Sequence, residues 1–177
     1  DRATADYIGM LATVMNALAL HEVLERAGLP ARVMSALAVT GVAEPFVRVK
    51  ALAHLAAGKV VLFGGGIGNP YFTTDTAACL RAIDIGAQLL LKATKVDGVY
   101  DVDPLRNTTA RRYEQLDYDE VLARHLGVMD ATAVALAREH GLPVRVFDMN
   151  SRGALLRIVH GEPVGTLMGP AADGRQT

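Results

Sequence analysis

The sequence has little of several residue types, and each shortage argues against a class of protein. Its 177 residues contain one cysteine, no tryptophan, and only 5% aromatic side chains. A lone cysteine, Cys79, cannot form an internal disulfide, which fits a reducing compartment such as the cytoplasm. Opposite charges nearly cancel to a net −1, so the chain lacks the basic excess of a nucleic-acid surface. We also expect no apolar run of the ~20 residues that a membrane span needs.

The remaining composition is that of a folded protein. Hydrophobic residues make up 51% of the chain and charged residues 21%, which excludes disorder. We expect one domain at residues 1–169 and a polar tail at residues 170–177. Strand and helix patterns alternate, which predicts an α/β fold with a mainly parallel open sheet and helices on both faces. Helices are expected at about 5–27, 46–57, 75–86, 118–125, 130–140 and 153–159, and strands at about 31–37, 59–63, 88–92, 143–147 and 164–168.

A glycine run follows one of these strands. The segment Val60–Phe63 is short, apolar and β-rich, and four of the next five residues, 64–68, are glycine. Glycine lets a ligand approach the backbone closely, and a helix is expected to begin at Thr74 or Asp75. Because a helix N-terminus attracts anions, this arrangement is suited to a phosphate. The alternative is a tight connection that binds nothing.

Two common phosphate-binding motifs are excluded. A Walker loop ends in Gly-Lys-Ser/Thr, whereas Gly68 is followed by Asn69 and Pro70. A dinucleotide fingerprint counted from Gly64 requires glycine where Asn69 stands. The loop therefore binds a ligand in some other way, or binds none.

Two of the four lysines lie shortly after the loop. Lys92 follows Leu89–Leu91 and is expected to end a strand at the C-terminal edge of the sheet, with Lys95 close behind. Phosphoryl transfer needs reacting groups held in line and their negative charge neutralised, which lysine can do. The alternative for Lys92 is a strand-end lysine that reaches into water. Asp75 and Asp130 each head an expected helix, so each is a helix cap, an acidic site residue, or both.

Longer blocks around these residues resemble a known family. They closely resemble the bacterial uridylate (UMP) kinases, members of the amino-acid-kinase superfamily, and the resemblance covers nearly the whole chain. The blocks are residues 9–19 (GMLATVMNALA), 68–78 (GNPYFTTDTAA), 92–100 (KATKVDGVY), 128–130 (VMD) and 142–147 (LPVRVF).

The resemblance implies a function, a fold and a set of site residues. The function is transfer of the γ-phosphoryl group of ATP to UMP, giving UDP and ADP in pyrimidine nucleotide biosynthesis. The fold is the three-layer sandwich of the superfamily. The implied catalytic residues are Lys92, Asp75 and Asp130. The implied UMP-binding residues are Asp6, Gly68, Asn69, Pro70, Tyr71, Phe72, Thr73 and Thr74, and the implied ATP-binding residues are Thr94, Lys95, Tyr100 and Asp103.

Some of these residues also have structural interpretations, and the chain departs from the family in two ways. Asp6 is alternatively a cap of the first helix, Tyr100 a packing residue, and Asp103 with Pro104 a turn. Ile67 stands where many relatives have threonine, and we expect uracil preference to persist through other contacts. Relatives also carry an upstream strand, a lysine and another glycine loop, so we expect the chain to lack the family's N-terminal segment.

The expected partners follow from the same resemblance. The five histidines are scattered, so we expect no metal site in the protein itself, and Mg²⁺ would enter with ATP. The resemblance implies a homohexamer with GTP activation and UTP inhibition. The first helix, with Met10 and Met15, is either an interface or core. Two other functions stay open, a non-catalytic nucleotide-binding or storage protein and a kinase for a carboxylate or carbamate acceptor.

Overall fold

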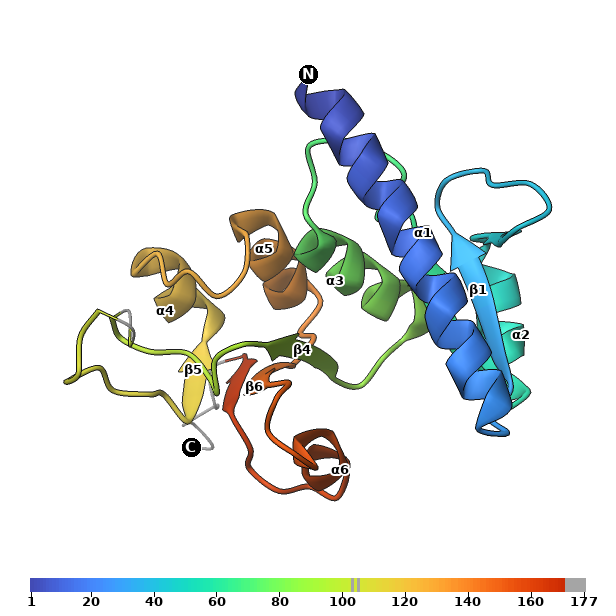
Figure 1. The fold of residues 1–177 in the computed structure, drawn as a ribbon. Helices are drawn as coiled ribbons and strands as arrows, with labels where there is room; N and C mark the ends of the chain where they lie inside the picture. Colours follow the sequence, from blue (N-terminus) through green and yellow to red (C-terminus); the bar gives the residue numbers. More distant parts are fainter. Residues whose placement is uncertain (103, 105, 171–177) are drawn as a thin grey trace, which may run out of the picture. The chain divides into compact units, whose positions relative to one another are not determined.

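The computed structural model describes residues 1–102, 104 and 106–170 (Figure 1). The chain divides into two compact units, Asp1–Ile85 and Gly86–Thr177. Each unit has its own sheet, with helices packed against it, and most strand pairs are parallel. The predicted α/β class with mainly parallel pairing is therefore confirmed.

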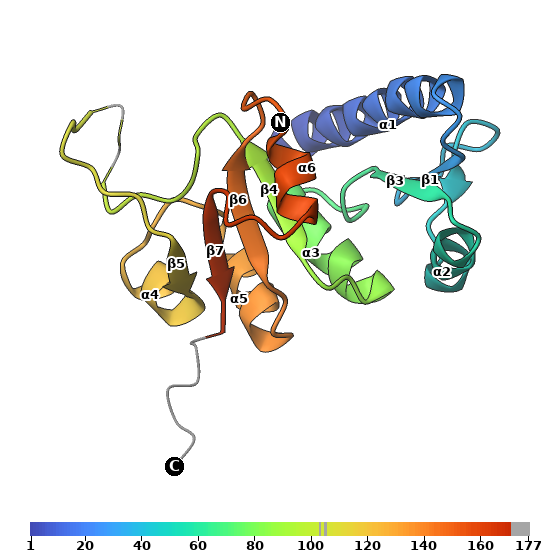
Figure 2. The same ribbon diagram turned by 90° about the horizontal axis from the view of Figure 1, so that it is seen from below.

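The first unit is a three-stranded parallel sheet in the order β2-β1-β3. Its helices α1 and α2 lie on opposite faces of the sheet, as the two views in Figures 1 and 2 agree. The elements are α1 (Arg2–Arg26), β1 (Ala31–Ser35), β2 (Glu44–Pro45), α2 (Arg48–Ala56), β3 (Val60–Gly64) and α3 (Thr74–Ile85). β1 and β3 pair along their whole lengths, so the glycine loop begins beside the end of β1.

Helix α1 is capped at both ends and packs by one face. The Asp1 side chain accepts a hydrogen bond from the Thr4 backbone N–H at 2.8 Å, and Gly28 follows the last turn with φ of 76°. Its buried side chains are Met10, Val14 and Ala17. This segment corrects one expectation, because an 18-residue stretch of α1 is long and apolar enough to cross a membrane by length and composition. A mostly buried core helix and an N-terminal signal sequence pass the same test; 17% of this stretch is buried, and α1 packs on β1 and β3.

The two-residue strand β2 was not predicted. The Glu44 carboxylate, at its first residue, lies 2.8 Å from His54 Nε2 and 3.3 Å from Lys50 Nζ, both on α2. The hydrogen bond to His54, with Lys50 nearby, holds the pKa of Glu44 below its ordinary value. Contacts to α2 and pairing with β1 hold β2, and a two-residue segment carries no periodicity that a sequence could show.

The second unit is a four-stranded sheet in the order β4-β6-β7-β5, with β6 and β7 antiparallel. α5 and α6 lie on opposite sides of this sheet (Figure 2). The elements are β4 (Leu90–Thr94), β5 (Gln115–Asp117), α4 (Tyr118–Ala123), α5 (Ala131–Glu139), β6 (Val144–Asp148), α6 (Ala154–Val159) and β7 (Thr166–Gly169). Phe147 of β6 forms a buried cluster with Ala154 and Ile158 of α6.

The expected helices and strands are all present, with ends shifted by at most three residues, and two short strands were missed. β5 was overlooked for the same reason as β2, because its three residues are defined by pairing with β7. β4 was expected to end at Lys92 but runs to Thr94, where its partner Asp148 also ends β6. The prediction that Lys92 ends its strand is therefore wrong, since the paired strand extends the ladder by two residues.

Candidate active site

The first pocket lies in the first unit, between α1 and the loop that joins β3 to α3. Its volume is about 220 Å³. Asp6, Met10 and Thr13 reach it from one face of α1, because residues three or four apart share a helix face. Its walls are Ala5, Asp6, Gly9, Met10, Thr13, Gly66, Ile67, Asn69, Phe72, Thr73 and Thr74.

Asp6 ties α1 to the far part of this loop. Its Oδ2 accepts a hydrogen bond from the Tyr71 backbone N–H at 2.7 Å, and both carboxylate oxygens lie 3.1 Å from Arg2 Nε. The Tyr71 N–H, helped by Arg2, lowers the pKa of the Asp6 carboxyl below its ordinary value. Asp1 caps α1 and Asp6 lies inside the helix, so the capping interpretation of Asp6 is excluded.

Thr13 is a site residue that the sequence analysis missed. Its hydroxyl donates to the Met10 carbonyl at 2.6 Å and accepts from the Gly65 backbone N–H at 2.8 Å. It thereby fixes the start of the glycine loop against α1. The sequence signal for Thr13 was its spacing from Asp6 and Met10, which places all three on one helix face. This spacing identifies Thr13 as a site residue only when Asp6 has already been assigned to the site.

The glycines of the loop have a packing role as well as lining the pocket. Gly65 has φ of 77°, and a Cβ there would lie 2.9 Å from both the Leu37 backbone N and Ser35 Oγ. Gly64 is equally crowded, with Val14 Cα 3.0 Å from the Cβ it lacks. Gly66, in contrast, lines the pocket. The tight-connection interpretation therefore holds for Gly64 and Gly65, while the next residues face the pocket.

The N-terminus of α3 forms the end of the loop. The helix begins at Thr74, one of the two predicted positions. The Thr73 hydroxyl accepts from the backbone N–H groups of Asp75 and Thr76 at 3.1 and 3.2 Å, so Thr73 acts as the cap. Asp75 is in the first turn, where a negative charge interacts favourably with the helix dipole. The interpretation of Asp75 as the cap itself is therefore wrong.

The residues assigned to UMP fall into two groups. Asp6, Asn69, Phe72, Thr73 and Thr74 line the pocket. The other three, Gly68, Pro70 and Tyr71, lie on the same loop but outside the pocket lining. Among these three, the Tyr71 N–H holds Asp6, and Gly68 takes φ of 89° with its N–H bonded to the Gly65 carbonyl at 3.0 Å.

The second pocket lies in the second unit and is larger, with a volume of about 580 Å³. This volume is in the range that small-ligand sites occupy, roughly 300–1,000 Å³. Strands β4 and β6, the segment after β4, and the loop between α4 and α5 enclose it. Its walls are Lys92, Thr94, Val96, Gly98, Val99, Tyr100, Asp101, Val102, Pro104, Arg124, His125, Leu126, Gly127, Val128 and Val146.

Lys92 is a half-buried cation in the wall of this pocket. It is the central residue of β4 and pairs with Val146 of β6. Its Nζ donates to the Val128 carbonyl at 2.6 Å, which ties β4 to the loop before α5. The interpretation as a strand-end lysine reaching into water does not fit this position.

Asp130 is the N-cap of α5. Its side chain accepts from the backbone N–H groups of Thr132 and Ala133 at 3.0 and 3.1 Å. It lies two residues after Val128, the carbonyl partner of Lys92. The capping role expected for Asp130 is present, and its acidic role in the reaction stays a prediction.

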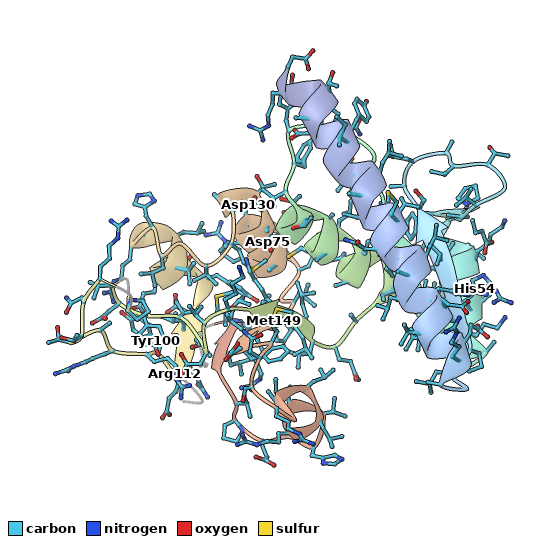
Figure 3. The ribbon with its side chains drawn as sticks, viewed as in Figure 1. His54, Asp75, Tyr100, Arg112, Asp130 and Met149 are labelled. Atoms are coloured by element: carbon cyan, nitrogen blue, oxygen red, sulfur yellow. The ribbon has the colours of Figure 1, made fainter. Side chains whose placement is uncertain are left out.

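Tyr100 and Thr94, both assigned to ATP, line the second pocket. Tyr100 lies beside Arg112, as Figure 3 shows and an antiparallel bridge between them requires. Its hydroxyl donates to Asp97 Oδ1 at 2.7 Å, and this bond raises the pKa of Tyr100. The Thr94 hydroxyl donates to the Val96 carbonyl at 2.8 Å and turns the chain at the end of β4.

The other two residues assigned to ATP are Lys95 and Asp103. Lys95 is exposed and is absent from the walls. Asp103 lies outside the described residues. The loop at Arg124 to Val128 was missed, and its only sequence signal was the resemblance at Val128 to Asp130.

The two pockets offer complementary chemistry. The first combines a carboxylate with loop backbone and hydroxyl groups, which suits a ribose and a phosphate. The second combines a lysine with an apolar wall, which suits a base and a polyphosphate. Across residues 1–102, 104 and 106–170, no group of three or more His, Cys, Asp or Glu side chains could hold a metal ion.

Comparisons with known proteins identify the family of this chain. Residues 1–148 match the Amino acid kinase family. The chain is 60% identical over 172 residues to uridylate kinase from Legionella pneumophila strain Corby, covering 97% of this chain and 70% of the relative. Uridylate kinase from Pseudomonas syringae pv. syringae is 59% identical over 95% of this chain and 68% of its own length.

Two solved structures have the same fold. UMP kinase from Bacillus anthracis superposes with a TM-score of 0.95 at 42% identity, over 97% of this chain and 71% of that one. UMP kinase from Ureaplasma parvum superposes at 0.91 with 33% identity, over 96% and 72% of the two chains. On the matched sequence, the shared fold and these identities, the chain belongs to the amino acid kinase family, among its uridylate kinases.

Proposed function

We propose that this protein is a phosphotransferase that moves the γ-phosphoryl group of ATP to UMP, giving UDP and ADP. The observation that carries the proposal is 60% identity to a uridylate kinase over 97% of the chain. The alternative of a non-catalytic nucleotide-binding or storage protein is not favoured, because relatives this similar are named as kinases.

The chemistry asks mainly for positioning and charge neutralisation. A nucleoside monophosphate has a second phosphate pKa near ~6, so UMP is largely ionised at neutral pH and needs no strong general base. The protein must bring two negative groups together in line and offset the charge that spreads over the transferred phosphoryl group. Lys92 supplies the cation, since its half-buried Nζ lies in the wall of the second pocket.

We assign UMP to the first pocket and ATP to the second. Asp6 carries the UMP ribose, and the loop from Gly68 to Thr74 carries the base and phosphate. Thr94 and Tyr100 contact ATP, and Lys95 and Asp103 remain assigned to ATP by resemblance. Asp75 and Asp130 are assigned by resemblance to orient a lysine or engage Mg²⁺ near the phosphates. The pocket linings support the roles of Asp6, Thr94 and Tyr100 and of part of the loop, and the roles of Asp75 and Asp130 rest on the resemblance alone.

Further properties rest on the family resemblance. Mg²⁺ would enter with ATP, coordinated mostly by phosphate oxygens and water. Residues 1–169 would act as one kinase domain in the cytoplasm. A homohexamer, with GTP activation and UTP inhibition, is the proposed assembly. Its support is the outer face of α1, where Met15 is 70% exposed while Met10 is buried.

The direct test is ADP formation from ATP with UMP, using CMP as the matched acceptor control, on the full-length protein. The expected result is turnover with UMP and little with CMP, which would also show that Ile67 is compatible with uracil selection. A folded protein that binds ATP but turns over neither nucleotide would overturn the kinase proposal and favour a binding protein.

A further inference from the structure

Two arms of chain pair beside the second pocket, and the first of them lines it. The first arm is residues 97–101 and the second is residues 111–113, and we call them together the wall hairpin. The Tyr113 N–H donates to the Val99 carbonyl at 2.8 Å, and the Asp101 N–H donates to the Arg111 carbonyl at 3.1 Å. Residues 98–101 of the first arm line the pocket, so the position of this hairpin sets the shape of the ATP site.

Thr166, the first residue of β7, holds both arms with one hydroxyl. Its Oγ1 accepts from the Val99 backbone N–H at 2.9 Å and donates to the Tyr113 carbonyl at 2.5 Å. A hydroxyl has one donor and two acceptor sites, so a single side chain can satisfy both arms. Thr166 is 0% exposed and Val99 4%, so the Val99 N–H has no water as an alternative partner, whereas Tyr113 is half-buried.

Close packing brings the hydroxyl to this place. A Cβ on Gly98 would lie 2.5 Å from Thr166 Oγ1. A Cβ on Gly165 would lie 2.0 Å from the Val146 carbonyl, and Val146 is both the β6 partner of Thr166 and a wall residue of the pocket. The absence of side chains at Gly98 and Gly165 therefore allows Thr166 to pack closely against the hairpin and β6.

A second contact steadies the outer part of the hairpin. Asp97 accepts from the Tyr100 hydroxyl at 2.7 Å and from Arg112 Nη1 at 3.0 Å, so it also joins the two arms. Asp97 and Arg112 are partly exposed, which weakens their ion pair through solvent screening. The buried Thr166 hydroxyl is the stronger of the two connections.

We propose that Thr166 is a positioning residue for the donor nucleotide. It is not itself among the residues that line the pocket, and it acts through Val99 and Tyr113, which place Gly98 and Tyr100 in the pocket wall. Without its hydroxyl, the buried Val99 N–H loses its acceptor and the Tyr113 carbonyl loses its donor, so the ATP wall is no longer held to β7. The inference rests on the proposed assignment of ATP to this pocket.

The test compares three variants of the full-length protein with the parent. Thr166→Ser keeps the hydroxyl, Thr166→Val keeps the shape without it, and Thr166→Ala removes the hydroxyl without adding bulk. The dissociation constant for ATP is measured by calorimetry, the KM for each substrate by ADP formation, and folding by circular dichroism. We expect Thr166→Val to weaken ATP binding about tenfold, a change of ~1.4 kcal/mol, with Thr166→Ser within about threefold of the parent.

The KM for UMP is expected to stay within about twofold, because the UMP pocket is lined only by residues 5–74. If Thr166→Val does not fold, Thr166→Ala decides in its place. Unchanged ATP affinity in a folded valine or alanine variant would overturn the proposal, as would an equal loss in Thr166→Ser. A parent protein that binds ATP without phosphorylating UMP would refute the proposed function alone, and the ATP affinities would still test Thr166.

Discussion

Gly65→Ala is expected to destabilise the first unit well beyond the ordinary effect of a left-handed glycine. Gly65 has φ of 77°, a conformation that costs an L-residue about 1–2 kcal/mol. The added methyl group would also lie 2.9 Å from the Leu37 backbone N and from Ser35 Oγ. Ser35 is 2% exposed and Leu37 N belongs to the main chain, so neither group can move away freely.

The second contribution to the destabilisation of Gly65→Ala is overpacking, which costs about 1–3 kcal/mol in a well-packed site. Together the two terms give a loss of roughly 2–5 kcal/mol in the free energy of unfolding. The chain offers a matched control in Gly28, with φ of 76° and nothing within 4 Å of the Cβ it lacks. Gly28→Ala should therefore show the backbone term alone, about 1–2 kcal/mol.

The assay is urea unfolding of both variants followed by far-ultraviolet circular dichroism, with thermal melting as a second measure. A chain of this size loses about 2–4 °C in Tm for each kcal/mol, so Gly65→Ala should melt several degrees below Gly28→Ala. Equal destabilisation of the two variants would refute the argument that the loop is packed too tightly for a side chain.

Two further predictions concern the proposed substrates. Asp6→Ala is expected to raise the KM for UMP at least about tenfold. Asp6→Asn is expected to raise it less, because the amide oxygen can still accept the hydrogen bond from the Tyr71 N–H. Equal increases in KM for the two variants would contradict this role for the hydrogen bond. That bond lowers the pKa of Asp6 below its ordinary value of 3.8. The stability that the ionised Asp6 gives the folded protein is therefore fully present above about pH 4 and is lost as the pH falls through the folded-state pKa. The KM for UMP should accordingly show no change due to Asp6 titration between about pH 5 and 8. Lys92→Ala is expected to lower kcat about 10²–10³-fold, measured by ADP formation. The control is Lys59→Ala, because Lys59 lies outside both pocket linings. A kcat of Lys92→Ala within about threefold of the parent would exclude Lys92 from charge neutralisation.

Several features of the site could be predicted from sequence because they depend on local chemistry. The start of α3 at Thr74 follows from capping residues before a run of good helix formers, and the structure places it there. The strand before the glycines follows from its continuous β-branched and apolar residues, and β3 occupies Val60–Gly64. Both signals lie within a few residues, so no distant contact was needed to interpret them.

The length of a strand depended on its partner instead. The apolar pattern ends at Leu91, yet β4 continues to Thr94 because β6 offers backbone groups as far as Asp148. The same holds for β2 and β5, which exist only through pairing with β1 and β7. Hydrogen bonds between strands are contacts across sequence distance, and a single segment does not encode them.

By itself, the sequence determined the local elements, the glycine loop, and the blocks that identify the family. Tertiary structure decided which residues meet at the pockets and behind them. Thr13 meets the glycine loop, the Val128 carbonyl meets Lys92, and Thr166 meets both arms of the wall hairpin. Thr166 lies 53 residues after Tyr113 and 67 after Val99 in the chain. Hydrogen bonds act over about 3 Å, so only the folded chain brings these groups within reach.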